Sequence, residues 1–378
     1  MLILLSVSFL NKMLDYTFFI DENIPLLADS FAHFINVVRF KGRNLSKEDL
    51  IKHKCISLIC RSTTLVNNNL LDGTNVRFVG TTTSGIDHVD IRYLKDNNIA
   101  FSYAPGSNAN SVAEYVLFAI LEWKKRHNLE LNNKTIGIIG YGNIGKLVAL
   151  YSYLLGLKVL VNDPPLKDEG YKFPEYVSYK EIVEIFCEAN IITNHVPLTN
   201  EGNYPTKYLI NRTLLNILNN NSLFIHTSRG SVVDEKALVT AIKTKNITTV
   251  IDVWEGEPLV NEELMNLSFI STPHIAGYSY DGKLKGALMI ATDLNNYFKM
   301  GIDLSKIHQE LSNNTLFSRS IFGDLNKLYN TLNNKRQILE DGVNFKKIMY
   351  LSKDLKRKYL DELRKKYPKR RESIFISI

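Results

Sequence analysis

Short runs of β-branched and aromatic residues alternate with segments of helical period along most of this sequence. The first series of runs consists of DYTFFID (15–21), CISLICR (55–61), VRFVGTT (76–82) and IAFSYA (99–104). Strands separated by helical segments pair in parallel, because a crossover helix carries the chain back to the start of the next strand. The alternation therefore predicts an α/β fold in which helices cover a parallel sheet.

A second series of runs predicts a second sheet. The segment 108–127, which has apolar residues at helical spacing, separates the two series. Five further runs follow, at 134–140, 158–163, 190–196, 222–228 and 248–254. We expect these five strands to form a self-contained sheet, followed by a helix over 279–298. Beyond Gly301 the strand signal fades into polar, helical sequence, which indicates a third, smaller unit. With 378 residues, the chain exceeds the usual size of one hydrophobic core.

Charge and cysteine content limit the classes of partner. Most of the net charge of +7 lies between residues 353 and 372, where there are ten Lys or Arg and four Asp or Glu. We interpret this stretch as a solvated helix face, with nucleic-acid binding as a minor alternative that predicts steeply salt-dependent affinity. The three cysteines, Cys55, Cys60 and Cys187, form no C-x-x-C pair. This argues against a structural zinc site and favours a reducing cytoplasm.

The first ten residues, MLILLSVSFL, resemble the apolar part of a signal peptide. However, no basic residue precedes them and no clear small-residue cleavage site follows. We therefore expect an N-terminal extension ahead of Met13, with the true start at either Met1 or Met13. No later apolar run reaches the length of a membrane span.

The sequence TIGIIGYGNIG carries Gly140, Gly142 and Gly145 at the G-x-G-x-x-G spacing, with Asn143 and Ile144 between the last two. It follows an apolar run directly and opens a helical segment. Glycines at these positions permit a tight turn and let the backbone approach a pyrophosphate, whose charge the helix N-terminus favours. The pattern predicts a dinucleotide site.

Asp163 indicates which dinucleotide binds. It ends the next apolar run, 18 residues after Gly145. A carboxylate there can accept hydrogen bonds from an adenosine ribose and would repel a 2′-phosphate, so NAD is favoured over NADP. The alternative is that Asp163 merely caps the turn before Pro164 and Pro165.

Three polar residues that follow runs of the second series suit the oxidation of a hydroxyl group. They are Arg229 in HTSRG, Glu257 in DVWEGEP and His274 in TPHIAGY. His274 can take the hydroxyl proton, Glu257 can fix its tautomer, and Arg229 can hold a carboxylate or the reacting oxygen. His195 and His226 also follow runs, and spacing alone does not exclude them.

The motifs GYGNIG, SRGSVVDEKAL, DVWEGEP and TPHIAGY, in this order after a long helix, resemble those of the D-isomer-specific 2-hydroxyacid dehydrogenases. The resemblance covers about residues 76 to 300. It implies that Arg229, Glu257 and His274 occupy the family's catalytic positions, and so settles the choice among the histidines. Further contacts with NAD are implied for Asp163, Val196, Thr227, Ser228, Arg229, Asp252, Gly277 and Tyr278.

Substrate contacts are implied at two positions, Ser62 in CRST and Thr83 in TTTSG. The loop Thr83, Ser84 and Gly85 also makes chemical sense, because its backbone N–H groups could receive a substrate carboxylate. Arg61 adjoins Ser62 and is a candidate partner for a phosphate, although a structural ion pair is an equal alternative. No metal ion is implied.

A narrower resemblance, carried by DENIP, YAPGSNANSVAEYV, NDPP and YPKRRES, points to the members of this family that oxidise 4-phospho-D-erythronate to 2-oxo-3-hydroxy-4-phosphobutanoate in vitamin B6 synthesis. It implies a Rossmann-like NAD-binding domain (113–276) inserted in a flavodoxin-like α/β substrate domain (1–112 and 277–300). A C-terminal domain (301–378) would form a homodimer. Another 2-hydroxy acid, such as 3-phosphoglycerate, and a dinucleotide-sensing binding protein on the same fold are the alternatives.

Overall fold

The computed structural model describes residues 15–376, which fold into two compact units. Unit 1 comprises the chain up to Asn108 together with Ser279–Thr315, and unit 2 comprises Ala109–Tyr278 together with Leu316–Ile378. The N-terminal apolar segment and Met13 lie outside the described residues. Among residues 15–376, no helix combines the length and the apolar character that crossing a bilayer requires.

Unit 1 is built on a parallel sheet of five strands in the order β2-β1-β3-β4-β5, the order of flavodoxin-like folds. The strands are β1 (Thr17–Asp21), β2 (Asn36–Phe40), β3 (Cys55–Cys60), β4 (Phe78–Thr81) and β5 (Ala100–Tyr103). Four of them match the predicted runs. Strand β2 was not predicted, because four of its five residues are at least partly exposed at the sheet edge, so it has no continuous apolar run.

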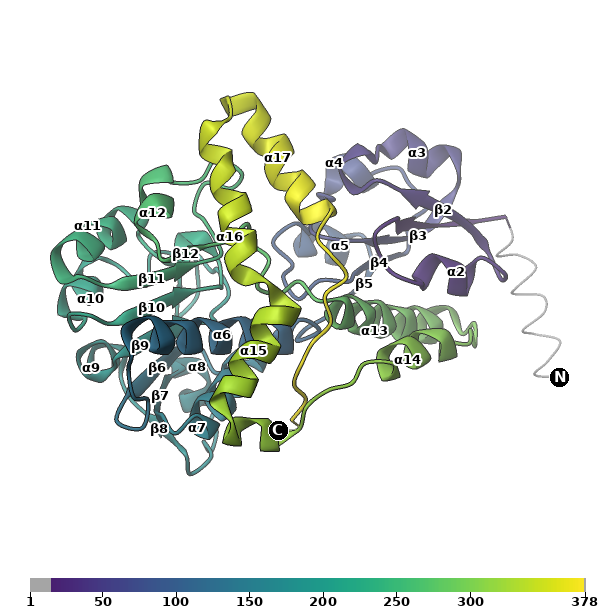
Figure 1. Cartoon of the computed structure of the whole chain (residues 1–378). Helices are drawn as coiled ribbons and strands as arrows, with labels where there is room; N and C mark the ends of the chain where they lie inside the picture. Colours follow the sequence, from purple (N-terminus) through teal and green to yellow (C-terminus); the bar gives the residue numbers. More distant parts are fainter. Residues whose placement is uncertain (1–14, 377–378) are drawn as a thin grey trace. The chain divides into compact units, whose positions relative to one another are not determined.

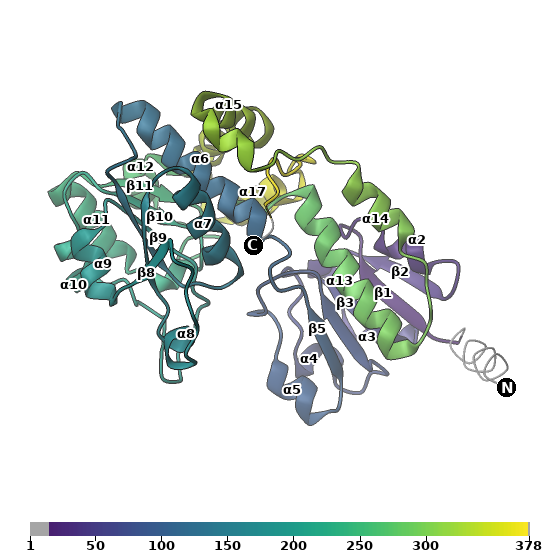
Figure 2. The same ribbon diagram turned by 90° about the horizontal axis from the view of Figure 1, so that it is seen from below.

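Helices cover both faces of the unit 1 sheet (Figures 1 and 2). One face packs against α2 (Leu27–Phe31) and α13 (Tyr280–Phe298), and the other against α3 (Lys47–Lys52), α4 (Asn68–Leu71) and α5 (Ile91–Asp96). The remaining elements are η1 (Gly42–Asn44) and α14 (Ser305–Ser312). The predicted helix over 279–298 is confirmed as α13, and it completes the core of a sheet whose strands end far earlier in the sequence.

Unit 2 is built on a parallel sheet of seven strands in the order β12-β11-β10-β9-β6-β7-β8. The strands are β6 (Thr135–Ile139), β7 (Lys158–Asn162), β8 (Val177–Tyr179), β9 (Ile191–Asn194), β10 (Leu223–His226), β11 (Thr248–Ile251) and β12 (Ile270–Ser271). Counted from β6, this is the Rossmann order with one added strand. The predicted fold class is confirmed, but the prediction of five strands was wrong, since β8 and β12 are too short to form runs.

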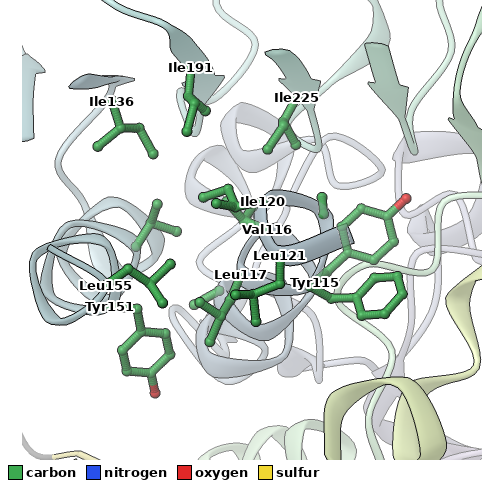
Figure 3. Packing of buried hydrophobic residues seen from close by; sticks show 14 of the residues in the cluster. Tyr115, Val116, Leu117, Ile120, Leu121, Ile136, Tyr151, Leu155, Ile191 and Ile225 are labelled. Atoms are coloured by element: carbon green, nitrogen blue, oxygen red, sulfur yellow. The ribbon is translucent and has the colours of Figure 1, made fainter. Parts of the chain in front are cut away.

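A long helix, α6 (Ala109–His127), crosses one face of this sheet and is buried from its first residue to Trp123. Figure 3 shows Val116 and Ile120 of α6 facing Ile136 and Ile191 of the sheet. On the same face lies α7 (Asn143–Leu154), while α9 (Ile182–Glu188), α10 (Arg212–Ile217), α11 (Glu235–Lys245) and α12 (Glu262–Leu267) contribute to the core of the other face. The short elements are α8 (Pro164–Asp168) and η2 (Gly230–Val232).

The chain beyond Leu316 returns to unit 2 as helices, shown in green to yellow in Figure 1. They are η3 (Arg319–Gly323), α15 (Leu325–Arg336), α16 (Ile338–Lys346), η4 (Lys347–Tyr350) and α17 (Lys353–Lys365). Arg336 is fully buried and donates to Ser111 Oγ at 2.7 Å and to the Ala276 carbonyl at 3.0 Å. The C-terminal segment is therefore tied to α6 by polar contacts as well as by apolar packing.

Candidate active site

The loop between β6 and α7 has the backbone that the glycine pattern predicts. Gly140 has a φ of +94°, and a Cβ there would lie 2.9 Å from Val196 Cγ1. A Cβ at Gly145 would lie 2.1 Å from the Gly140 carbonyl oxygen, whereas one at Gly142 would meet no described atom within 4 Å. Gly140 and Gly145 therefore close the turn, and the space beside Gly142 is open for a ligand to approach the backbone.

Asp163 follows β7 and faces this loop. Its Oδ2 accepts a hydrogen bond from the Tyr141 N–H at 2.7 Å, and its Oδ1 accepts one from the Leu166 N–H at 3.2 Å. Asp163 thus caps α8 and also holds the glycine loop. Each carboxylate oxygen can accept a second bond, so capping does not prevent an additional contact with a ribose.

Two buried polar atoms beside the loop lack a hydrogen-bond partner among the described residues. They are Thr227 Oγ1 and His195 Nδ1, just past β10 and β9 at the carboxyl edge of the sheet. The strand order reverses between β6 and β9, which is where dinucleotides bind in open α/β sheets. Because buried polar atoms normally have partners, the two orphaned atoms fit a site that holds a polar ligand.

The other residues assigned to the cofactor also belong to unit 2. Ser228 is buried and its hydroxyl donates to Asn194. Asn143 and Ile144 lie in the first turn of α7, and Val196 lies past β9. Gly277 and Tyr278 lie on the loop that follows β12. The edge of the sheet can therefore offer backbone and side-chain groups along the length of a dinucleotide.

The structure brings His274 and Glu257 together. His274 Nδ1 lies 3.1 Å from each carboxylate oxygen of Glu257, whose Oε1 also accepts a bond from the Trp254 N–H at 3.1 Å. Burial opposes the ionised carboxylate, but His274 and then Arg364 outweigh it and hold the pKa of Glu257 well below its ordinary value. An ionised Glu257 accepts the Nδ1 proton, so Nε2 is the nitrogen that can take a proton from a substrate.

The backbone at His274 is strained, with a φ of +60°. Non-glycine residues rarely adopt this left-handed conformation, and the surrounding structure has to enforce it. Asp252, just past β11, does so: its Oδ1 accepts from Thr272 Oγ1 at 2.6 Å and from the Ile275 N–H at 2.8 Å, and its Oδ2 accepts from the Ala276 N–H at 2.9 Å. Asp252 therefore holds the loop that carries His274. Its assigned contact with the cofactor stays a prediction.

Arg229 follows β10 on a half-buried loop, and its Nη1 donates to the Ser228 carbonyl at 2.8 Å. The neighbouring Gly230 packs closely against the segment that follows β11. A Cβ at Gly230 would lie 2.1 Å from the carbonyl carbon of Trp254 in that segment. The loop of Arg229 thus lies against the connection that carries Glu257. A guanidinium here can make a bidentate contact with a carboxylate.

Of the other two histidines of this region, His226 differs clearly from His274 in solvent access. The His274 side chain is 36% exposed, whereas His226 is 1% exposed. Burial lowers the pKa of His226 to about 4, and burial followed by the neighbouring His226 lowers the pKa of His195 to about 3. His195 and His226 therefore remain neutral at physiological pH and are poorly placed to exchange protons with a substrate.

In unit 1, the residues assigned to the substrate lie past β3 and β4. Thr83 Oγ1 donates to the Gly85 carbonyl at 2.8 Å, and Ser84 Oγ lies 2.8 Å from Asn108 Oδ1. These contacts hold the loop 83–85 in a fixed turn. Ser62 is exposed just past β3, the strand adjacent to β4. The structure therefore gathers the four residues at one edge of the unit 1 sheet.

Charged residues lie at the same edge. Arg61 Nε donates to Asp21 Oδ1 at 3.1 Å, and the Asp21 side chain is fully buried. Lys283 is in the first turn of α13, a helix whose Gly286 approaches the Thr82 carbonyl. Burial, followed by the charge of Arg61, lowers the pKa of Lys283 to about 8. Arg61 and Lys283 both interact electrostatically with the buried Asp21 carboxylate, so two cations lie at this edge.

Sequence reasoning missed two cations of the candidate site, Lys283 and Arg364. Lys283 is one of four charged residues in SYDGKLKGALMIATDLNNYF, with no pattern to distinguish it. Arg364 was included in the solvated basic segment, but its side chain is only 20% exposed and contacts Glu257. Arg370 of the same segment is buried against Asp341. The interpretation of this segment as a solvated face is therefore incomplete.

Among residues 15–376, no three side chains of the metal-binding types form a cluster.

Known proteins resemble this chain in both sequence and structure. The family model for the NAD binding domain of D-isomer specific 2-hydroxyacid dehydrogenases matches residues 115–276. An erythronate-4-phosphate dehydrogenase of Wigglesworthia glossinidia brevipalpis is 42% identical over 284 residues, which cover 74% of this chain and 72% of the relative. One of Hahella chejuensis is 36% identical over 356 residues, covering 93% and 91%.

Two solved structures have the same fold. A D-lactate dehydrogenase from Aquifex aeolicus, complexed with NAD and lactic acid, aligns with a TM-score of 0.61 and 22% identity over 79% of this chain and 98% of its own. An NAD⁺-bound 3-phosphoglycerate dehydrogenase of Entamoeba histolytica aligns with a TM-score of 0.63 and 23% identity, covering 76% and 98%. At these identities the likeness establishes the architecture.

Proposed function

Because this chain belongs to the D-isomer specific 2-hydroxyacid dehydrogenase family, and within it to the erythronate-4-phosphate dehydrogenases, we propose that it oxidises 4-phospho-D-erythronate at C2 to 2-oxo-3-hydroxy-4-phosphobutanoate. The enzyme is an oxidoreductase with NAD as cofactor. The observation that carries the mechanism is the His274–Glu257 pair, in which Nδ1 faces an ionised carboxylate.

In this proposal His274 is the catalytic base. Nε2 takes the proton of the C2 hydroxyl, and Glu257 stabilises the positive charge that the imidazole gains. Arg229 binds the reacting C2 oxygen and orients C2. Bound beside Gly140, Gly142 and Gly145, NAD would supply the acceptor for the hydride from C2. The protein thus moves a proton and fixes the reacting oxygen, which makes the C2 hydrogen available for transfer.

Unit 1 supplies the groups that select a phosphorylated acid. We assign the substrate carboxylate to the backbone of the loop 83–85, assisted by Ser62, and the phosphate to Arg61 and Lys283. The support for the latter is charge: Asp21 compensates one of the two cations, and the start of α13 adds the positive end of a helix dipole. A half-buried lysine near an arginine and at a helix N-terminus provides a favourable electrostatic environment for an anion.

A homodimer formed through the C-terminal helices is also part of the proposal. Large apolar side chains there face solvent in the single chain: Val343 is 66%, Tyr350 86% and Leu355 50% exposed. Grouped exposed apolar residues commonly mark protein interfaces.

We place the enzyme in the cytoplasm, because Cys187 is a free, exposed thiol of the kind that persists in reducing compartments.

The test is a comparison of substrates with purified protein. NADH formation, or reduction of a 2-oxo acid acceptor if the cofactor stays bound, is measured with 4-phospho-D-erythronate, D-3-phosphoglycerate and D-lactate. We expect kcat/KM for 4-phospho-D-erythronate to exceed that for D-lactate at least about 100-fold, since D-lactate lacks the phosphate that pairs with two cations. It should also exceed that for D-3-phosphoglycerate, whose phosphate lies one carbon closer to C2 and so reaches the two cations less well. Preference for another acid would shift the assignment to that substrate. Bound NAD without any turnover would favour a dinucleotide-sensing role instead.

A further inference from the structure

Arg364 on α17 reaches the catalytic pair from the C-terminal segment. Its Nη2 contacts Glu257 Oε2, and its Nε donates to the Pro273 carbonyl at 2.8 Å. Pro273 immediately precedes His274. One guanidinium therefore holds both the carboxylate that orients the imidazole and the backbone that carries it.

This contact is electrostatically significant. The side chains of Arg364 and Glu257 are 20% and 19% exposed, so water screens their charges only weakly. Burial opposes the charge of Arg364, but Glu257 outweighs it and raises the pKa of the guanidinium above its ordinary value. The Glu257 carboxylate is thus shared between two groups, a permanently charged arginine and a histidine that changes charge during the reaction.

The remaining groups near this pair do not duplicate the role of Arg364. His226 remains neutral, because burial lowers its pKa to about 4. Glu235 of α11 is close enough to interact with Glu257, and burial raises the pKa of this carboxyl. Asp252 and Tyr278 interact with Arg364 itself.

Resting on the proposed function, we propose that Arg364 is a positioning residue that fixes Glu257 and the His274 loop, and that sets the pH range in which His274 takes the substrate proton. A permanent cation at Glu257 removes part of the negative charge that would otherwise stabilise imidazolium. Its presence keeps His274 in the neutral, proton-accepting form at lower pH. Without it, imidazolium persists to higher pH, which hinders oxidation and favours the reverse reduction.

The experiment compares Arg364→Leu, which removes the charge, with Arg364→Lys, which keeps the charge but cannot bridge Glu257 and Pro273 in the same way. Arg357→Leu, an exposed cation on the same helix, is the matched control. The pH dependence of kcat is measured in both directions. For Arg364→Leu we expect the acid limb of the kcat profile for oxidation to move about one pH unit toward higher pH. This is the low end of the pKa change that a nearby charge causes in a titratable group.

For Arg364→Lys we expect the wild-type midpoint but a kcat lowered about tenfold, because the carboxylate is less well positioned. Arg357→Leu should match the wild type in both respects. A wild-type midpoint for Arg364→Leu, in protein whose thermal unfolding shows it to be folded, would overturn the proposal. So would equal losses of activity in both Arg364 variants with unchanged pH profiles.

A second measurement separates this proposal from the substrate assignment. The imidazole of His274 can be titrated by NMR of histidine-labelled protein without any substrate, using His274→Gln to assign its resonance. We expect the titration midpoint to rise in Arg364→Leu and to stay near the wild-type value in Arg364→Lys. If the enzyme failed to oxidise 4-phospho-D-erythronate, this titration would still decide whether Arg364 controls His274. Should Arg364→Leu prove unstable, Arg364→Gln replaces it in both measurements.

Discussion

Three histidines of unit 2 lie near the carboxyl edge of one sheet, and their environments differ. His195 and His226 have pKa values lowered by burial, while the His274 side chain is 36% exposed and contacts an ionised carboxylate. Substitution should reflect this difference: replacing a buried histidine disturbs packing, whereas replacing His274 removes chemistry.

For His274→Gln we predict a loss of kcat of about 10²- to 10⁴-fold, the usual contribution of a general base. NAD affinity should change less than about threefold, because the imidazole is assigned to the substrate. Steady-state kinetics and equilibrium NAD binding check both values. His127→Gln, at an exposed position on α6, is the control and should be fully active. Turnover within tenfold of wild type would exclude His274 as the base.

At Asp163 the prediction concerns the choice of cofactor. Asp163→Ala should weaken NAD binding about 10- to 100-fold, since it removes both the assigned ribose contact and the bond from the Tyr141 N–H. The affinity for NADP should fall less, because a repulsive charge is removed as well. Titrations of both dinucleotides measure this, with Asp168→Ala on the same short helix as control. An unchanged ratio of the two affinities would refute the assignment.

At this scale, sequence predicts what is local. The three glycines, Asp163 and the helix start lie within a short stretch, so their spacing fixes their geometry. Arg364 could not be predicted, because its contact with Glu257 spans 107 residues of sequence. Lys283 and Thr227 acquire their burial from tertiary packing, which no local pattern records.

At the scale of secondary-structure elements, the first turn of α13 leads to a specific prediction, because it carries Lys283. Lys283→Met should raise KM for 4-phospho-D-erythronate at least about tenfold and leave KM for unphosphorylated D-erythronate nearly unchanged. In the wild type, the same KM should rise above pH 8, where Lys283 loses its proton in the protein without substrate. Initial-rate kinetics test both statements, with Lys285→Met on the same helix as control. Equal effects on both substrates would show that Lys283 does not bind the phosphate.

Helix α6 buries a carboxyl group, Glu114, whose Oε1 accepts from the backbone N–H groups of Ser373 at 2.5 Å and Ile374 at 2.8 Å. Burial raises its pKa from 4.5 to about 7, with Arg336 opposing the shift. The folded state therefore retains a proton that the unfolded state releases. This contribution is full below about pH 4.5 and is lost as pH rises through 7.

It follows that Glu114→Gln, which keeps the acceptor oxygen, should show a smaller fall in unfolding temperature between pH 5 and pH 8 than the wild type. Glu114→Ala removes the acceptor for two buried N–H groups and should cost about 2 kcal/mol or more at every pH. Thermal unfolding across this pH range distinguishes the two variants. Parallel curves for wild type and Glu114→Gln would mean that Glu114 does not titrate in the folded protein.

The elements themselves were predictable to the extent that they are buried. Strands with continuous apolar runs were found from sequence, and α6 and α13 were placed within one residue of their observed ends. The edge strand β2 and the very short β8 and β12 were missed, because partial exposure or brevity leaves too few apolar residues to form a pattern.

For the whole molecule, the exposed apolar residues of the C-terminal helices predict self-association. Tyr350→Lys together with Val343→Lys should convert a dimer into a monomer, as measured by sedimentation velocity, because two charges cannot be buried in an apolar interface without partners. Leu65→Lys, at a position 65% exposed in unit 1, is the control and should remain dimeric. A monomeric wild type at micromolar concentration would contradict the proposal.

The division of the chain also governs the order in which the protein can be made. Unit 1 is interrupted at Asn108 and resumes at Ser279, and unit 2 is interrupted at Tyr278 and resumes at Leu316. Since a ribosome delivers residues from the N-terminus, α6 emerges long before Ser373 and Ile374, which supply the donors for Glu114. Apolar surface of both sheets therefore stays uncovered until the later segments, Ser279–Thr315 and Leu316–Ile378, have been synthesised. The nascent chain should therefore depend on chaperone protection for most of its synthesis, and slow translation would lengthen that exposure.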